Sequence, residues 1–307
     1  MQELMEGSKY PKTSWQVWWK LLRPHTLTAA FIPVVIGTAL ALELGEVNWL
    51  LFAAMLIASL LIQSATNMFN EYYDYKRGLD TAESVGIGGA IVREGIDAKF
   101  ILKLAFIFFA SALALGIYIC INSSWWIGAV GIISMAAGYF YTGGPYPIAY
   151  SPFGELVAGL FMGLIIILIA FYIQTGTITL ESILISIPIS ILCGAILTAN
   201  NIRDLEGDKR SGRRTIAILL GHHHSIHFLA GMFIVSYLWI IGMILFVSST
   251  PFLLLSFLSI SKAVEAVKGF VGKKKPIEMM PAMKATAQTH TSFGFLAAVG
   301  LLLGYFI

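Results

Sequence analysis

The sequence predicts an all-helical, polytopic membrane protein with nine transmembrane helices, arranged as two four-helix halves plus a ninth helix. Composition is the first observation: 57% of the 307 residues are hydrophobic and only 12% are charged, whereas a typical soluble domain has about 25% charged residues. The other two observations are a series of long apolar runs and a one-sided distribution of basic residues. So little charge excludes a soluble globule, a disordered chain and a nucleic-acid-binding protein, despite the net charge of +3.

Nine apolar runs are expected to form the spanning helices, since about 20 helical residues cross the hydrocarbon core of a bilayer. They lie at 26–42, 48–66, 100–121, 125–141, 154–174, 180–199, 226–247, 250–267 and 289–306. The eighth run is the weakest, because Lys262 and Glu265 fall near its end. Strands of a membrane barrel would alternate in polarity over about ten residues, whereas these runs are continuous. Residues 1–307 are therefore expected to form one membrane domain, with a cytoplasmic, interfacial N-terminal segment at 1–24.

The basic residues predict the orientation of these helices. With nine spans, all 20 Lys and Arg residues fall on the side of the N-terminus. The opposite loops contain none: 43–47, 122–124, 175–179 and 248–249. Because cytoplasmic loops are enriched in Lys and Arg, we expect the N-terminus in the cytoplasm and the C-terminus outside.

Two long cytoplasmic segments carry the candidate chemistry. They lie at 67–99 and 200–225, after the second and sixth helices, in corresponding positions of the two halves. Each contains the pattern Asn-x-x-x-Asp, as Asn70 and Asp74 in the first and Asn200 and Asp204 in the second. Four residues turn a helix by only about 40° past a full turn, so each pair lies on one helix face, and Asp208 continues the second face.

Opposed carboxylates need a cation between them, because like charges destabilise one another. Carboxylate and amide oxygens are ligands that Mg²⁺ prefers, usually together with water and substrate phosphates. The sequence therefore predicts a diphosphate held through Mg²⁺ between two acid-bearing helix ends. Nearby basic side chains are expected to neutralise the phosphates further: Lys76, Arg77, Arg203, Lys209 and Arg214.

With these motifs the chain resembles the UbiA superfamily of intramembrane prenyltransferases, and in particular its menaquinone-pathway branch. Four further stretches carry the resemblance, at 23–29, 141–147, 208–215 and 281–287, so it covers nearly the whole chain. The resemblance implies a UbiA-like fold with Mg²⁺ as cofactor. It implies transfer of a polyprenyl group from polyprenyl diphosphate to 1,4-dihydroxy-2-naphthoate in the lipid bilayer, with loss of CO₂ and diphosphate, giving demethylmenaquinone. The implied location is the plasma membrane of a bacterium, with a cytoplasmic active site.

The resemblance also assigns roles to individual residues. Asp74, Asp204 and Asp80 match catalytic acids of the family. The metal positions match Asn70, Asp74, Asn200, Asp204 and Asp208, and Arg203 is a companion of the second motif. One departure is Glu71, where many relatives have Asp. Asp80 follows Gly78 and is expected on a loop.

Several residues leave two interpretations open. The uncharged stretch 141–147 is either a tight turn or part of an acceptor pocket that Tyr141 or Tyr146 contacts. Arg23 either pairs with a substrate or lies at the membrane interface. For Glu155, complementing the dipole of the fifth helix is favoured over catalysis.

Three further features have a favoured interpretation. The glycine-rich stretch 86–89 is expected to be a flexible cap. The histidines near 222–227 lack partners for a zinc site, and the lysines at 273–275 are expected to set topology.

Two other function classes compete with this prediction. A related enzyme that uses another aromatic acceptor, such as 4-hydroxybenzoate or a chlorophyll or haem precursor, would share the donor chemistry. An ion-coupled transporter would place acids near the bilayer midplane between inverted repeats. Here both motifs are predicted on one side and the halves repeat in parallel, which disfavours the transporter.

Overall fold

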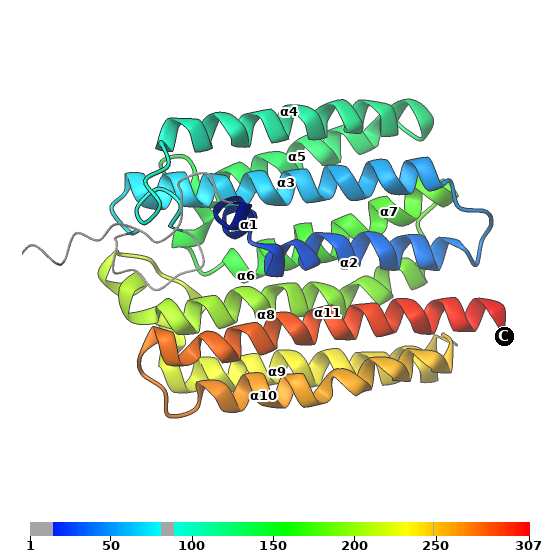
Figure 1. The fold of residues 1–307 in the computed structure, drawn as a ribbon. Helices are drawn as coiled ribbons and strands as arrows, with labels where there is room; N and C mark the ends of the chain where they lie inside the picture. The colour runs from blue at the N-terminus through cyan, green and yellow to red at the C-terminus, as the bar shows by residue number, and fades with distance from the viewer. Residues whose placement is uncertain (1–14, 81–88, 248) are drawn as a thin grey trace, which may run out of the picture.

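The computed structural model describes residues 15–80, 89–247 and 249–307, and in these residues the only regular structure is helical. The helices run α1 Trp15–Leu22, α2 Pro24–Ala41, α3 Trp49–Lys76, α4 Ala98–Asn122, α5 Trp126–Thr142, η1 Ile148–Tyr150, α6 Gly154–Ala158, η2 Gly159–Ile165, α7 Ile166–Thr175, α8 Leu180–Arg210, α9 Ile216–Phe246, η3 Pro251–Ser259, α10 Ile260–Phe270 and α11 Pro276–Phe306. The long helices lie side by side along one direction (Figure 1). The predicted all-helical class is therefore confirmed for the described residues.

Six helical stretches among the described residues are long and apolar enough to cross a membrane. They are Trp49–Lys76, Ala98–Asn122, Gly154–Thr175, Leu180–Arg210, Ile216–Phe246 and Pro276–Phe306. Two shorter apolar helices accompany them, Thr26–Ala41 and Trp126–Thr142. By length and composition the chain is thus a multi-pass membrane protein. The predicted eighth span differs from the others, because the 3₁₀ helix η3 and the α-helix α10 share its length.

The helices that carry the acidic motifs extend well beyond their apolar runs. The second run was expected to end at residue 66, but α3 continues to Lys76. The sixth was expected to end at residue 199, but α8 continues to Arg210. The motif residues are good enough helix formers to prolong a helix already fixed by packing. Each Asn-x-x-x-Asp pattern therefore lies on a helix, as its spacing requires for one face.

The N-terminal part of the described chain turns sharply at Arg23. Helix α1 is seen nearly along its axis in Figure 1, whereas the long helices run across the view. Between α1 and α2, Arg23 has φ 53° and ψ 64°, the left-handed region that a non-glycine residue rarely adopts. Pro24 then occupies the first turn of α2, where its missing N–H is not needed. This turn directs the Arg23 side chain toward the ends of α3 and α8.

The stretch Gly154–Thr175 packs closely against α8 through two glycines in a π-helical turn. A Cβ on Gly159 would lie 2.6 Å from the Ser190 carbonyl oxygen, and one on Gly163 would lie 2.4 Å from the Ser190 Cα. Larger residues have no room there, and π-helical turns often mark functional sites. Helix α11 packs against α2, α8 and α10, so it contacts helices from both the beginning and the end of the chain.

Candidate functional site

A polar cavity of ≈ 1180 Å³ lies where the C-terminal ends of α3 and α8 meet. All six acid and amide side chains predicted for the metal and catalytic positions line it: Asn70, Asp74, Asp80, Asn200, Asp204 and Asp208. Helical spacing explains why each motif presents its side chains together. The packing of the helices brings the two motifs to the same cavity.

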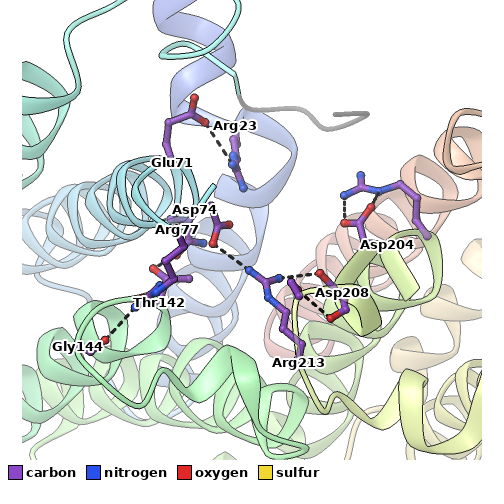
Figure 2. A network of polar contacts seen from close by, with 12 residues as sticks. Arg23, Glu71, Asp74, Arg77, Thr142, Gly144, Asp204, Asp208 and Arg213 are labelled. Carbon is purple, nitrogen blue, oxygen red and sulfur yellow. Dashed lines mark hydrogen bonds and ion pairs between the residues drawn. The ribbon is translucent and has the colours of Figure 1, made fainter. Parts of the chain in front are cut away.

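An arginine joins the two motifs across this cavity (Figure 2). Arg213 lies between α8 and α9. Its Nη2 donates to Asp74 Oδ1 at 2.9 Å, and its Nη1 donates to Asp208 Oδ1 at 3.1 Å. Its guanidinium also lies 5.2 Å from the centre of the Tyr150 ring. Burial alone would lower the pKa of Arg213, but the charges of Asp74 and Asp208 raise it above its ordinary value, so the group stays protonated.

Asp204 is paired with its neighbour in the sequence. Arg203 donates to both carboxylate oxygens of Asp204 (Figure 2), with Nε 2.6 Å from Oδ1. The remaining nitrogen of the buried Arg203 side chain donates to Met283 Sδ on α11 at 2.7 Å. The third predicted catalytic acid, Asp80, follows the end of α3 on a loop. Burial raises the pKa of Asp80 to about 6, and the charges of Asp74 and Glu71 act in the same direction.

Glu71 lines neither cavity and anchors the segment that follows the first motif. Its Oε1 accepts hydrogen bonds from the backbone N–H groups of Gly89 at 2.7 Å and Ile91 at 3.3 Å. Its Oε2 lies 3.6 Å from Arg23 Nη2. The side chain is only 1% exposed. The Glu side chain is one methylene longer than that of Asp, and this length lets its carboxylate reach the backbone of residues 89–91. The predicted flexible cap at 86–89 lies outside the described residues except for Gly89.

The stretch 141–147 is anchored to the end of α3. Thr142 Oγ1 donates to Asn70 Oδ1 at 2.7 Å. Arg77 donates to the carbonyl oxygens of Thr142 and of Gly144, the latter at 2.9 Å (Figure 2). The two tyrosines that were predicted to contact the acceptor differ in position. Tyr141 lines the cavity, whereas Tyr146 is 92% exposed.

An apolar cavity of ≈ 550 Å³ continues from the polar one. The two cavities share the lining residues Arg23, Thr26, Asn70, Tyr141, Leu197 and Asn200. Beyond this junction the apolar cavity is lined by side chains of α3, α4, α5 and the stretch Gly154–Thr175, as far as Trp125. The combined space suits a molecule with an anionic head and a long apolar tail.

Only one of the basic residues predicted to bind the diphosphate lines a cavity in the structure. Arg203 lines the polar cavity, whereas Lys76, Arg77, Lys209 and Arg214 line neither cavity. Residues that the sequence interpretation did not assign to the site line the polar cavity instead: Arg93, Arg210, Arg213, Lys273, Lys274 and Lys275. Residue spacing does not tell which of two consecutive arginines faces a cavity, and the lysines reach it only through the packing of the loop between α10 and α11.

Glu155 makes a contact that its proposed helix-dipole role does not require. It is 4% exposed, and its Oε1 accepts a hydrogen bond from Asn201 Nδ2 at 2.8 Å. Asn201 lines the polar cavity, and Glu155 lies behind it. Near the N-terminus of α6, Glu155 thus positions a cavity residue of α8.

The donor set fits a magnesium ion, although the ligands are not gathered tightly around one point. In the described parts of the chain, no three His, Cys, Asp or Glu side chains form a ready ligand group, and this holds for the histidines of α9 as well. The cavity nevertheless offers hard oxygen donors from both motifs. The Arg213 guanidinium already places one positive group between Asp74 and Asp208. Mg²⁺ keeps several waters and uses few protein carboxylates, so this arrangement is compatible with it.

Comparisons with known proteins agree with this geometry. A sequence model described as the UbiA prenyltransferase family matches residues 30–276. A Bacillus subtilis protein named 1,4-dihydroxy-2-naphthoate octaprenyltransferase is 56% identical, over 98% of this chain and 97% of its own length. An Escherichia coli protein of the same name is 27% identical, over 94% of this chain and 96% of its own length.

Two solved structures have the same fold. A UbiA homologue from Archaeoglobus fulgidus, solved bound to DMAPP and Mg²⁺, has a TM-score of 0.62 at 16% identity, over 92% of this chain and 99% of its own. The apo structure of a UbiA homologue from Aeropyrum pernix K1 has a TM-score of 0.67 at 14% identity, over 92% and 98%.

Proposed function

This chain belongs to the UbiA prenyltransferase family and is a prenyltransferase, and on that premise we propose its substrates, cofactor and site residues. The donor is a polyprenyl diphosphate and the acceptor is 1,4-dihydroxy-2-naphthoate, as in the Bacillus subtilis relative's name. The reaction serves menaquinone biosynthesis. Diphosphate and CO₂ leave, and the immediate product is the quinol form of demethylmenaquinone, because the transfer itself involves no oxidant.

The observation that carries this proposal is the junction of the two cavities. A polar cavity with both acidic motifs opens directly into an apolar one. The diphosphate would lie in the first and the prenyl tail in the second. The bond that breaks, between the terminal prenyl carbon and the diphosphate oxygen, then falls near Asn70, Tyr141 and Asn200.

The acids and amides of both motifs are the proposed magnesium ligands. Asp74, Asp204 and Asp208 provide the carboxylates, with Asn70, Asn200 and Asp80 beside them. Bound Mg²⁺ would stabilise the negative charge of the departing diphosphate. The cofactor assignment is supported by the Archaeoglobus homologue solved with DMAPP and Mg²⁺.

This chain's own residues would position the reactants and exclude water. Arg23 and Arg203 lie where they can neutralise phosphate oxygens. The apolar cavity would keep water from the allylic carbon, which otherwise is hydrolysed. A ring carbon of the acceptor supplies the electron pair of the new carbon–carbon bond, and the diphosphate leaves with the pair of the broken carbon–oxygen bond. Tyr141 is the candidate contact for the acceptor ring.

The proposed topology has nine spans, with the N-terminus and the active site in the cytoplasm of a bacterial cell. The stretch Gly154–Thr175 forms the fifth span, and η3 with α10 forms the eighth. The one-sided basic residues support this arrangement. The C-terminus lies at the end of the bundle away from the loops that follow α3 and α8 (Figure 1), which would place it outside the plasma membrane. The site at one end of the bundle does not favour a transporter, which would bind near the midplane.

The full chain, purified and placed in lipid nanodiscs with Mg²⁺, tests the proposal. It would be given polyprenyl diphosphates with either 1,4-dihydroxy-2-naphthoate or 4-hydroxybenzoate, and the products would be identified by mass spectrometry. We expect a decarboxylated, prenylated naphthalene product that disappears with EDTA. Preferential prenylation of 4-hydroxybenzoate would reject the proposed acceptor, and no product with any aromatic acceptor would reject the enzyme.

A further inference from the structure

Arg213 occupies the position between the two acidic motifs where a metal ion would have to neutralise them. It bonds to Asp74 Oδ1 on α3 and to Asp208 Oδ1 on α8. Its side chain is 14% exposed, and the two carboxylates are 20% and 12% exposed. Both bonds use Oδ1, which leaves the Oδ2 atom of each carboxylate outside this bridge.

We infer that Arg213 is an exchangeable counter-charge, which holds the two motifs together before the substrate arrives and transfers to the diphosphate when Mg²⁺ enters. Four motif carboxylates line one partly buried cavity, and that of Asp204 is already paired with Arg203. Repulsion among the other three, those of Asp74, Asp80 and Asp208, would open the site without a cation. Mg²⁺ needs some of the same oxygen atoms. The incoming diphosphate offers the displaced guanidinium new acceptors, which arginine binds in a bidentate manner.

The surroundings of Arg213 permit this movement. The residue lies in the short connection between α8 and α9, next to Gly212, which has φ +80°. A Cβ built on Gly212 would meet no atom within 4 Å, so the connection has space beside it. The face of the Tyr150 ring, 5.2 Å from the Arg213 guanidinium, gives the cation a surface to move along. Exchange therefore needs a change of side-chain rotamer and no repacking of a helix.

The competing interpretation is that Arg213 does not move when Mg²⁺ binds. If Arg213 stayed on the Oδ1 atoms while Mg²⁺ bound the Oδ2 atoms, the arginine would organise the metal site. Its removal would then weaken Mg²⁺ binding. The exchange predicts the opposite, because removal of Arg213 abolishes a competitor for the carboxylates. The sign of the change in Mg²⁺ affinity separates the two.

The experiment compares Arg213→Gln with the neighbouring Arg214→Gln, which is exposed and lines neither cavity. Full-length protein in nanodiscs is titrated by calorimetry with MgCl₂ alone, and then with inorganic pyrophosphate at saturating Mg²⁺. We expect Arg213→Gln to bind Mg²⁺ alone about tenfold more tightly and pyrophosphate about tenfold more weakly than the wild type, the size of one charge-assisted hydrogen bond. Arg214→Gln should match the wild type in both titrations.

Mg²⁺ binding by Arg213→Gln that is unchanged or weaker than in the wild type would overturn the inference. If this variant does not fold, Arg213→Lys replaces it, because the lysine ammonium keeps the positive charge but lacks the planar guanidinium that bridges the two carboxylates. It should bind Mg²⁺ alone more tightly than the wild type, and equal or weaker binding would again overturn the inference. The inference rests on the proposed metal-dependent function, and different results of this experiment would reject the inference and the proposed cofactor. Absence of saturable Mg²⁺ binding by the wild type would reject the proposed cofactor itself.

Discussion

The Arg213 guanidinium lies 2.9 Å from the Asp74 carboxylate, although the two residues are 139 positions apart in the chain. This contact joins the end of α3 to the connection that follows α8. The site is therefore shared between segments that are far apart in the sequence. Small shifts of α3 relative to α8 would change the distance between the two acidic motifs, and with it the affinity for a metal ion and a diphosphate.

Replacement of Asp74 or Asp208 by Asn should nearly abolish prenyl transfer. Each change removes a charged oxygen donor from the proposed metal site and leaves Arg213 with one carboxylate fewer. Loss of electrostatic stabilisation of this kind lowers the rate by about 100-fold or more. The control is Asp97→Asn at the exposed start of α4, where Asn caps a helix as well as Asp does. Near-normal turnover by Asp74→Asn or Asp208→Asn in well-expressed membranes would contradict the assignment.

The affinity for Mg²⁺ should fall as the pH drops through about 6, because burial raises the pKa of Asp80 to about 6. Below that pH the Asp80 carboxyl holds a proton that Mg²⁺ must displace, and above it the carboxylate is free to bind. Calorimetric titration between pH 5 and pH 8 measures this, together with the protons released into buffers of different ionisation enthalpy. Asp80→Asn should bind Mg²⁺ more weakly at pH 8 and show a flatter pH profile. An unchanged profile would show that Asp80 does not take part.

Sequence reasoning predicted the helical membrane fold and the placement of each motif along one helix face, because both depend on local patterns. Apolar runs identify spans, and the Asn-x-x-x-Asp spacing places Asp74 and Asp204 on defined helix faces. The failures concern side-chain direction in irregular segments. Arg214 was named for the diphosphate, yet Arg213 is the residue that bridges the motifs.

The same limit explains the other differences. Tyr141 and Tyr146 belong to one stretch, but only the packing of α5 against α3 turns the first inward and leaves the second exposed. Glu71 was noted only as a departure from its relatives, because the sequence does not reveal that its carboxylate accepts hydrogen bonds from the backbone N–H groups of Gly89 and Ile91. These contacts depend on chain segments distant in sequence or on loop geometry, which periodicity does not encode.

Replacement of Glu71 by Ala should destabilise the protein and loosen the segment around residues 89–97. The change leaves two buried backbone N–H groups without their acceptor and removes the carboxylate beside Arg23. The cost is about 1–3 kcal/mol for each buried donor left unsatisfied. Thermal unfolding in detergent and the rate of tryptic cleavage after Arg93 report the two effects. Glu265→Gln is the control, since its exposed pair with Lys262 is worth about 1 kcal/mol at most.

Replacement of Gly163 by Ala should lower stability, because the stretch Gly154–Thr175 and α8 already touch at this position. The added Cβ would lie 2.4 Å from the Ser190 Cα, so α8 or the π-helical turn must shift, at a cost of about 1–3 kcal/mol. Gly231→Ala on α9 is a matched control, since its Cβ would meet nothing within 4 Å. The melting temperatures of the two variants in the same detergent decide the matter. Equal melting temperatures would contradict the close packing.

Replacement of Gly116 by Phe should shift donor preference toward shorter prenyl diphosphates. Gly116 lines the apolar cavity on α4, and a Cβ at this position would meet no atom within 4 Å. A phenyl ring there would fill space proposed for the distal part of the tail, while Asp74 and Asp208 at the polar end stay unchanged. The ratio of kcat/KM for a geranyl donor to that for an octaprenyl donor should therefore rise.

The matched control for this variant is Gly242→Phe on α9, which also has free space at its Cβ and lines neither cavity. Its donor ratio should equal that of the wild type. An equal loss of rate with both donors in Gly116→Phe would mean that the ring disturbs the bundle as a whole. An unchanged ratio would mean that the tail leaves the protein before it reaches α4, through a path between other helices into the lipid.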